Sequence, residues 1–144
     1  MRLEGTYTIA ASRAKVWELL MDPKAIASCV PGCQGFEPLG GDKYTVRLTA
    51  GVAAISGTFD GTVELKDQVA PESYRLVMEG SGGPGFVNGD ALIALSENGD
   101  TTTVTVTADV EVGGTIARVG QRLLGSVSKM MLDRFFACMA ARSG

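Results

Sequence analysis

Few residues in this chain could carry out chemistry, because histidine is absent from all 144 positions. Imidazole is the usual proton carrier near neutral pH and the commonest metal-binding side chain. The carboxylates Asp60, Glu64, Asp90, Asp109 and Glu111 alternate with apolar residues, which places them on the outward faces of predicted strands. Serines are present, but no base lies on an inward face to activate one. We therefore expect no catalytic residue and no enzymatic activity.

Cysteine provides one spacing that could bind a metal, Cys29-x-x-x-Cys33. On a helix this spacing would bring two sulfurs together, but Pro31-Gly32 lies between them and ends any helix. Structural zinc requires four nitrogen or sulfur ligands, and Cys138 is the one other cysteine. We expect no metal site and interpret the pair as small buried residues at a helix-to-strand corner, with a redox role as the alternative. Three cysteines also predict reduced thiols rather than a disulfide framework.

The glycine-rich run 80–85 has a superficial likeness to a phosphate-binding loop. No Gly-Lys-Ser/Thr follows it, and the next element is a predicted strand, so no helix N-terminus is available to bind a phosphate. We interpret the run as a flexible hairpin or bulge that could frame the mouth of a pocket.

Composition excludes several classes of protein. The formal net charge is −3 and basic residues are not clustered, so nucleic acid is not an expected partner. The first residues, Met1 to Gly5, contain no apolar run typical of a signal peptide, and no stretch of about 18 apolar residues could span a bilayer. A cytoplasmic location is expected.

Alternating apolar and polar residues predict strands along most of the chain. A first strand, 2–10, is followed by strands at 33–40, 44–50, 55–65, 74–78, 86–96 and 101–112. Asn98-Gly99 is a strong hairpin signal between the last two. Ser12 can cap a helix at 13–21, and Asp22-Pro23 can begin a short helix that ends near Ser28.

Thr115 can cap a long C-terminal helix that is predicted to run to about Ala141. At about 100° per residue, one apolar face would run along about 40 Å of it. Arg134 falls inside this predicted face. Burying an unpaired guanidinium would be strongly unfavourable, so Arg134 reaches water, pairs with a carboxylate or donates to a ligand carbonyl.

These elements predict one α+β domain over residues 1–144, with two short helices after strand 1. Evenly spaced strands joined by hairpin turns favour a seven-stranded antiparallel sheet. The long helix is the element able to cover its apolar face, and Gly57 and Gly61 on that face indicate sharp curvature. A curved sheet wrapped around a helix in this way is a helix grip. Either the two meet in a solid core, or they leave a cavity between them.

Several motifs in this order resemble CoxG, a subunit family of carbon monoxide dehydrogenase within the START-like (SRPBCC) superfamily. The matching features run nearly end to end: Asp22-Pro23, Val30-Pro31-Gly32-Cys33, Gly57-Thr58-Phe59-Asp60-Gly61, Gly83-Pro84-Gly85-Phe86-Val87-Asn88-Gly89, Val112-Gly113-Gly114, Ile116-Ala117, Gly120, Arg122-Leu123 and Phe135-Phe136.

The resemblance implies a helix-grip fold with a hydrophobic cavity between sheet and helix. Members occur beside molybdenum-containing carbon monoxide dehydrogenases and related hydroxylases, and they are thought to assist these enzymes at the membrane by binding a quinone or comparable lipid. Many members carry a membrane-attaching C-terminal extension. This chain departs from that pattern because it ends at Gly144, right after the predicted helix, so a direct membrane anchor is not expected. Membrane contact would be peripheral, at the inner face.

We therefore expect a non-catalytic carrier of an apolar, quinone- or lipid-like molecule, with no intrinsic cofactor, that serves such a dehydrogenase or hydroxylase. The alternatives are a maturation or recruitment factor with a filled core, and a START-like cyclase or hydrolase. The expected pocket residues are Ile26, Val30, Pro31, Tyr44, Val46, Leu48, Ile55, Phe59, Leu76, Met78, Phe86, Val106, Leu123, Val127, Met130, Met131 and Arg134.

Overall fold

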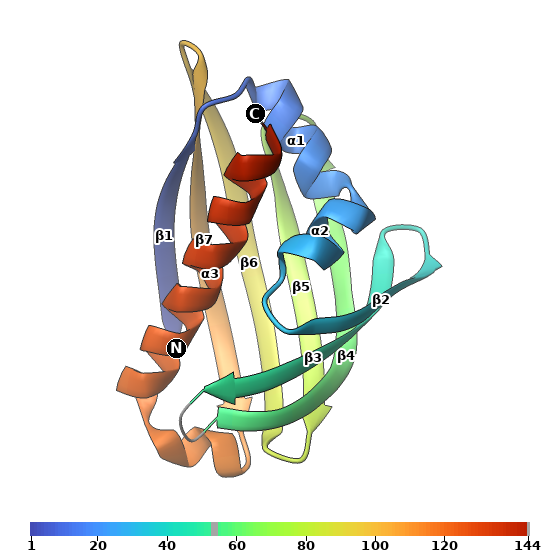
Figure 1. Ribbon diagram of the computed structural model, residues 1–144, viewed down its shortest axis with the longest axis vertical. Helices are drawn as coiled ribbons and strands as arrows, with labels where there is room; N and C mark the ends of the chain where they lie inside the picture. Colours follow the sequence, from blue (N-terminus) through green and yellow to red (C-terminus); the bar gives the residue numbers. More distant parts are fainter. Residues whose placement is uncertain (53–54, 144) are drawn as a thin grey trace.

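The chain folds around one strongly curved antiparallel sheet. A computed structural model describes residues 1–52 and 55–143. The sheet has seven strands in the order β1-β7-β6-β5-β4-β3-β2, and its inner face holds the helices (Figure 1). The elements in chain order are β1 (Arg2–Ile9), α1 (Arg13–Met21), α2 (Pro23–Cys29), β2 (Cys33–Gly40), β3 (Lys43–Val52), β4 (Ile55–Val69), β5 (Ser73–Gly82), β6 (Gly85–Asn98), β7 (Thr101–Gly113), the 3-10 helix η1 (Thr115–Val119) and α3 (Gln121–Ser143).

This architecture confirms the predicted helix grip, with each strand near its expected range. The predicted caps also form. The Ser12 side chain accepts a hydrogen bond from the backbone N–H of Lys15, and Asp22 accepts one from Lys24. The glycine-rich run 80–85 is a tight hairpin, in which β5 ends at Gly82 and β6 begins at Gly85. The connection between the strands predicted at 44–50 and 55–65 includes residues 53–54, which lie outside the described part of the chain.

The C-terminal helix differs from its prediction. Residues 115–119 form a separate 3-10 helix, and α3 begins only at Gln121. Gly120 separates the two with φ of 91°, a conformation that glycine adopts without strain. Thr115 does not cap this helix, since Gly114 stands at the cap position and no side chain accepts there. The helical phase of residues 115–119 therefore does not continue into α3.

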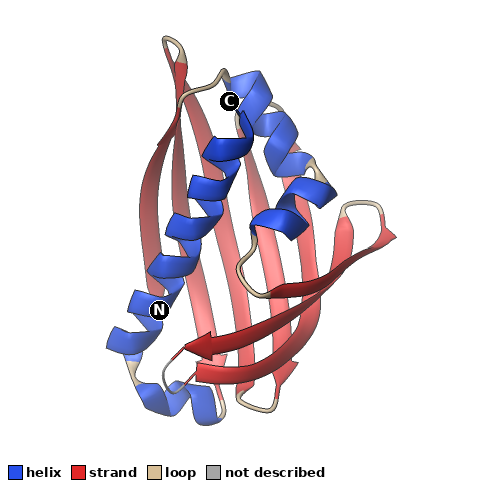
Figure 2. Cartoon of the chain, viewed as in Figure 1, coloured by secondary structure: helices blue, strands red, loops and turns tan. Residues whose placement is uncertain are grey.

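The core lies where helices cover the sheet. α3 packs against β1, α1, α2 and η1, and α1 and α2 lie at its C-terminal end (Figure 2). The larger apolar cluster lies at this end and includes Leu20 of α1, Ile26 of α2, Val104 of β7 and Phe136 of α3. A second, smaller cluster forms around Ile116 and Leu124 at the other end of α3.

A polar contact fixes the side of α3 that faces β1. The Tyr7 hydroxyl donates to Asp133 over 2.8 Å, and Lys129 donates to the same carboxylate over 3.0 Å. The Tyr7 ring also stacks on Phe136, with ring centroids 4.5 Å apart. Burial and the Asp133 carboxylate raise the pKa of Tyr7 to about 12. The two hydrogen bonds, from Tyr7 first and then Lys129, lower the pKa of Asp133.

The raised pKa of Tyr7 predicts that the folded protein loses stability at high pH. The phenol of Tyr7 ionises near pH 10 in the unfolded chain and near pH 12 in the folded one. Its contribution is therefore complete below pH 10 and is lost as the pH rises toward 12. Urea unfolding at pH 9 and at pH 11 should show that the free energy of unfolding falls more for the wild type than for Tyr7→Phe. Burial also raises the pKa of Tyr74, so the stability of Tyr7→Phe should still fall in part at high pH. Equal losses in the two proteins would contradict this assignment.

Candidate ligand-binding site

The inner face of β3, β4 and β5 is apolar but incompletely covered. Register places Tyr44 opposite Val63 and Val63 opposite Met78. On the same face, Val46 lies opposite Gly61 and Leu48 lies opposite Phe59. Among these residues Val46, Leu48, Val63 and Met78 are only half-buried, whereas the inner-face residues Ile93 and Val106 of β6 and β7 are buried.

This difference follows from the positions of the helices, since α1 packs against β6 and β7, whereas β3, β4 and β5 lie away from α3. The helix lies over β1 and against α1 and α2, and in the described part of the chain it makes no comparably close approach to β3, β4 or β5. The two apolar clusters lie at opposite ends of α3, and neither includes Val46, Leu48, Val63 or Met78. We call these four residues the central apolar surface. They lie on the inner face of the sheet, which borders the interior between sheet and helices, and they belong to neither cluster.

The curvature of the sheet widens this interior. A Cβ atom at Gly61 would overlap the carbonyl oxygen of Glu79 and lie 2.6 Å from the Cα atom of Gly80. Glycine at this position lets β4 and β5 approach closely as they bend together, as the sequence predicted for a glycine on this face. Beside the bend, Gly89, Ala91 and Ala108 are small and buried on the inner faces of β6 and β7. The inner faces of β6 and β7 therefore carry little side-chain bulk at these three positions.

The interior surface of these strands carries no formal charge. In the described parts of β3 and β5, and along β4 from Gly57 to Leu65, the inner-face positions contain no Asp, Glu, Lys or Arg. The polar groups nearest this region are the phenols of Tyr44 and Tyr74, both on buried residues. Burial raises the pKa of Tyr74, so its phenol stays neutral across the physiological range. Such a surface suits an uncharged apolar molecule.

Three of the predicted pocket residues, Val46, Leu48 and Met78, lie together on the central apolar surface. Val63 completes it and was missing from the expected residues, although its alternation with Phe59 places it on the same face. The expected residues of the larger cluster pack into solid core or against it: Ile26, Val30, Tyr44, Leu76 and Val106. Those of the smaller cluster do the same: Phe59, Leu123 and Val127. Pro31 is half-buried at the corner after α2, and Met130 and Met131 are half-buried on α3.

The prediction that Phe86 faces the interior is wrong. Ala91 and Ile93 are buried on the inner face of β6, and a strand period of two then turns Phe86 outward. Its ring lies over Gly113 of β7, where a Cβ atom would overlap it. The side chain of Ile55 lies outside the described residues.

Arg134 also lies outside the predicted apolar face. The predicted face runs through Leu123, Val127 and Cys138 of α3, but the helix buries a different side in the larger cluster. The buried residues of α3 are instead Leu124, Phe136 and Met139, and Arg134 is exposed. It lies one turn before Cys138, whose sulfur bonds to α2. Arg134 is therefore on the flank of α3 nearest α2, at the edge of the interior.

The prediction of reduced thiols is wrong for two of the three cysteines. Cys29, at the end of α2, forms a disulfide with Cys138 of α3. The two are separated by 109 positions in the sequence, and nothing in their local spacing indicates the pairing. Cys33 is a free, half-buried cysteine at the start of β2. No group of three or more potential metal-binding side chains occurs within residues 1–52 and 55–143.

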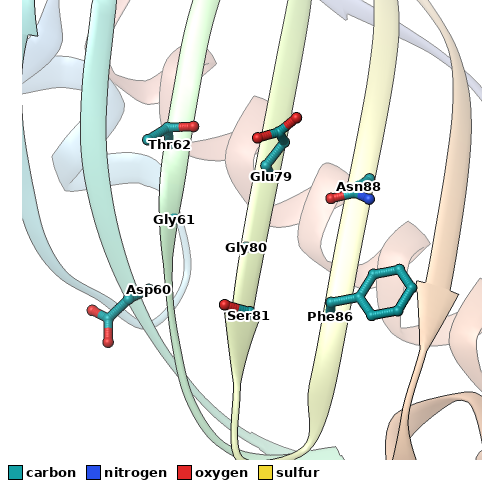
Figure 3. A pocket seen from close by; sticks show the side chains of 8 residues that line it. All are labelled: Asp60, Gly61, Thr62, Glu79, Gly80, Ser81, Phe86 and Asn88. Atoms are coloured by element: carbon teal, nitrogen blue, oxygen red, sulfur yellow. The ribbon is translucent and has the colours of Figure 1, made fainter.

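Two shallow hollows lie on the outer face of the sheet. One, of about 510 Å³, is lined by Asp60, Thr62, Glu79, Ser81, Phe86 and Asn88, all on the surface that faces away from the helices (Figure 3). The other, of about 370 Å³, adjoins it and shares Glu79 and Asn88. Their linings are mixed: acidic side chains such as Glu79 alternate with apolar ones, and the second hollow also includes Met78.

Comparison with known proteins assigns the family. The sequence model that matches residues 5–144 is that of CoxG, a subunit family of carbon monoxide dehydrogenase. This chain belongs to the CoxG family. The resemblance noted from the sequence motifs is thereby confirmed. A search of curated proteins gave no match. None of the helices in the described residues is long and apolar enough to cross a membrane.

Solved structures support the fold of this CoxG family member. A conserved protein from Geobacillus kaustophilus is 38% identical, with a TM-score of 0.96 over 99% of this chain and 94% of that one. A START superfamily protein from Mycobacterium smegmatis has a TM-score of 0.77 at 15% identity, over 99% and 96% of the two chains. The Zhui aromatase/cyclase from Streptomyces sp. R1128 has a TM-score of 0.73 at 18% identity, over 99% and 93%. The last two show a shared START-like fold alone.

Proposed function

We propose that this protein is a non-catalytic carrier that binds an apolar small molecule, quinone- or lipid-like, between the sheet and α3. The observation that carries the proposal is the central apolar surface, which is half-buried although it faces the interior. Covering about 200 Å² of apolar surface with a ligand would contribute about 5 kcal/mol before the unfavourable entropy of association is subtracted. The uncharged lining favours a neutral ligand body.

The absence of charged groups from this inner surface supports binding rather than turnover. General acid–base catalysis requires a titratable group within reach of the substrate. The described inner-face positions of β3, β5 and residues 57–65 of β4 offer none that ionises near neutral pH. The aromatase/cyclase neighbour shares the fold with this chain, and fold alone does not carry a reaction.

Membership of the CoxG family supports an accessory role beside a molybdenum-containing carbon monoxide dehydrogenase or a related hydroxylase. A carrier of a quinone- or lipid-like molecule must also exchange it with a bilayer, so peripheral membrane contact is part of the same proposal. The protein could instead recruit the dehydrogenase through surface contact alone. Substitutions inside the core should then leave its complex with the dehydrogenase unchanged, and the purified protein should contain no ligand.

The test is a pair of substitutions at adjacent positions of β4. Val63→Trp adds volume on the central apolar surface, whereas Thr62→Trp adds similar bulk on the outer face. We expect Val63→Trp to weaken binding of the neutral fluorescent probe N-phenyl-1-naphthylamine at least tenfold, because the indole occupies the ligand volume. Thr62→Trp should change it less than about twofold. Fluorescence titration measures both, with decylubiquinone as the displacing competitor.

A direct measurement accompanies these variants. Organic extraction of gently purified wild-type protein, followed by mass spectrometry, should yield a quinone or lipid that is depleted from Val63→Trp and retained by Thr62→Trp. Circular dichroism should show that both variants fold. Equal probe affinity in the wild type and a folded Val63→Trp would contradict ligand binding at this surface.

A further inference from the structure

The Cys29–Cys138 disulfide connects the segment that spans the interior to the helix that the sheet surrounds. α1 and α2 leave the end of β1 at one edge of the sheet and deliver the chain to β2 at the other edge. They pass over the inner face beside the C-terminal part of α3 (Figure 1). The disulfide joins the last residue of α2 to α3, with 5.4 Å between the two Cα atoms.

The remaining contacts between α2 and α3 are apolar packing. Ala25 and Ile26 of α2 are buried in the larger cluster, together with Phe136 and Met139 of α3. None of the ion pairs found in the described residues joins the two helices. In that part of the chain, α2 is thus held against α3 by apolar packing and by one covalent link between side chains, the disulfide.

The residues next to the disulfide pack against the larger cluster. Val30 follows Cys29, and Phe36 of β2 and Phe135 of α3 are half-buried against the same cluster. Movement of α2 away from α3 would separate these side chains. Such a movement would open the interior at the end where α2 leads into β2.

We propose that the Cys29–Cys138 disulfide is a redox-controlled clasp that holds α2 against α3 and slows exchange of the interior ligand. In the oxidised form the clasp keeps α2 in place. A dithiol reductant transfers two electrons and two protons to the bond, which yields the thiols of Cys29 and Cys138 and the reductant's own disulfide. α2 is then held by apolar packing alone, and local opening becomes more frequent. This proposal rests on ligand binding in the interior.

The pairing itself is tested by counting thiols. Alkylation of the unfolded, oxidised protein followed by intact-mass measurement should modify one cysteine, Cys33, and reduction beforehand should raise this number to three. Three modified cysteines in protein purified and kept under air would overturn the proposal.

The function of the clasp is tested by dissociation of N-phenyl-1-naphthylamine in stopped-flow experiments. Wild type reduced with a phosphine, Cys29→Ser and Cys138→Ser should each release the probe at least about tenfold faster than the oxidised wild type. Cys33→Ser is the matched control and should match the oxidised wild type, since Cys33 forms no disulfide. Reduction of the wild type needs no substitution in the core, so a variant that fails to fold does not decide the result.

Hydrogen exchange separates this proposal from the proposed function. Reduction should increase amide exchange in residues 23–30 and leave the inner strands β6 and β7 protected. Unchanged exchange in α2, or equal probe release before and after reduction, would overturn the clasp. Failure of the oxidised wild type to bind the probe would contradict the proposed function, and the exchange measurement would still decide whether the disulfide restrains α2.

Discussion

Gly61→Ala is expected to lower the free energy of unfolding by about 3 kcal/mol. A Cβ atom at this position would overlap the backbone of the neighbouring strand β5, at the carbonyl oxygen of Glu79 and the Cα atom of Gly80. Backbone atoms cannot change rotamer to make room, so β4 and β5 must separate where the sheet bends. Chemical denaturation monitored by circular dichroism measures the loss.

The control for this substitution lies directly opposite on β5. Gly80 is the register partner of Gly61, and the nearest atom to a Cβ there is the carbonyl oxygen of Asp60, at 3.9 Å. Gly80→Ala should therefore retain full stability or gain up to about 1 kcal/mol, because alanine restricts the unfolded chain. If the two variants lost equal stability, close approach of the strands would not be the reason that position 61 is glycine.

Phe136→Ala is expected to lower the free energy of unfolding by about 3–5 kcal/mol. The side chain is 3% exposed and belongs to the larger cluster. It stacks on Tyr7 of β1 and meets the ring of Phe135 edge to face, with centroids 5.1 Å apart. Its removal leaves a cavity between α3 and β1 and withdraws both aromatic contacts. Thermal and urea unfolding should show the loss.

Met130→Ala is the matched control on the same helix. Met130 is half-buried and belongs to neither apolar cluster, so its truncation should lower stability by less than about 1 kcal/mol. A loss equal to that of Phe136→Ala would contradict the position of α3 over β1. It would also question the interior region, because that region depends on α3 lying away from β3, β4 and β5.

Local patterns in the sequence were enough to predict most of the fold. Alternation in β4 and β7 predicted which residues face the helices, because a strand turns successive side chains to opposite faces. Ser12, Asp22 and Asn98-Gly99 marked helix starts and a hairpin through local backbone chemistry. Val46, Leu48 and Met78 lie on the inner face of the sheet, as their alternation predicted.

The errors have a common physical origin in contacts that local spacing does not encode. The side of α3 that is buried is set by its packing on β1, α1 and α2, so Leu124, Phe136 and Met139 are buried and Arg134 is exposed. The pairing of Cys29 with Cys138 brings together positions 109 residues apart. Neither can be read from a window of one helix turn or one strand.

The sequence by itself determined that this chain forms a curved antiparallel sheet around a C-terminal helix, because period-two and helical apolar patterns follow from local backbone geometry. Only the tertiary structure decided where α3 lies on the sheet. That position leaves the central apolar surface half-covered and places α2 where a disulfide can hold it. Packing between elements distant in sequence sets such positions, and the shape of the proposed binding site depends on them.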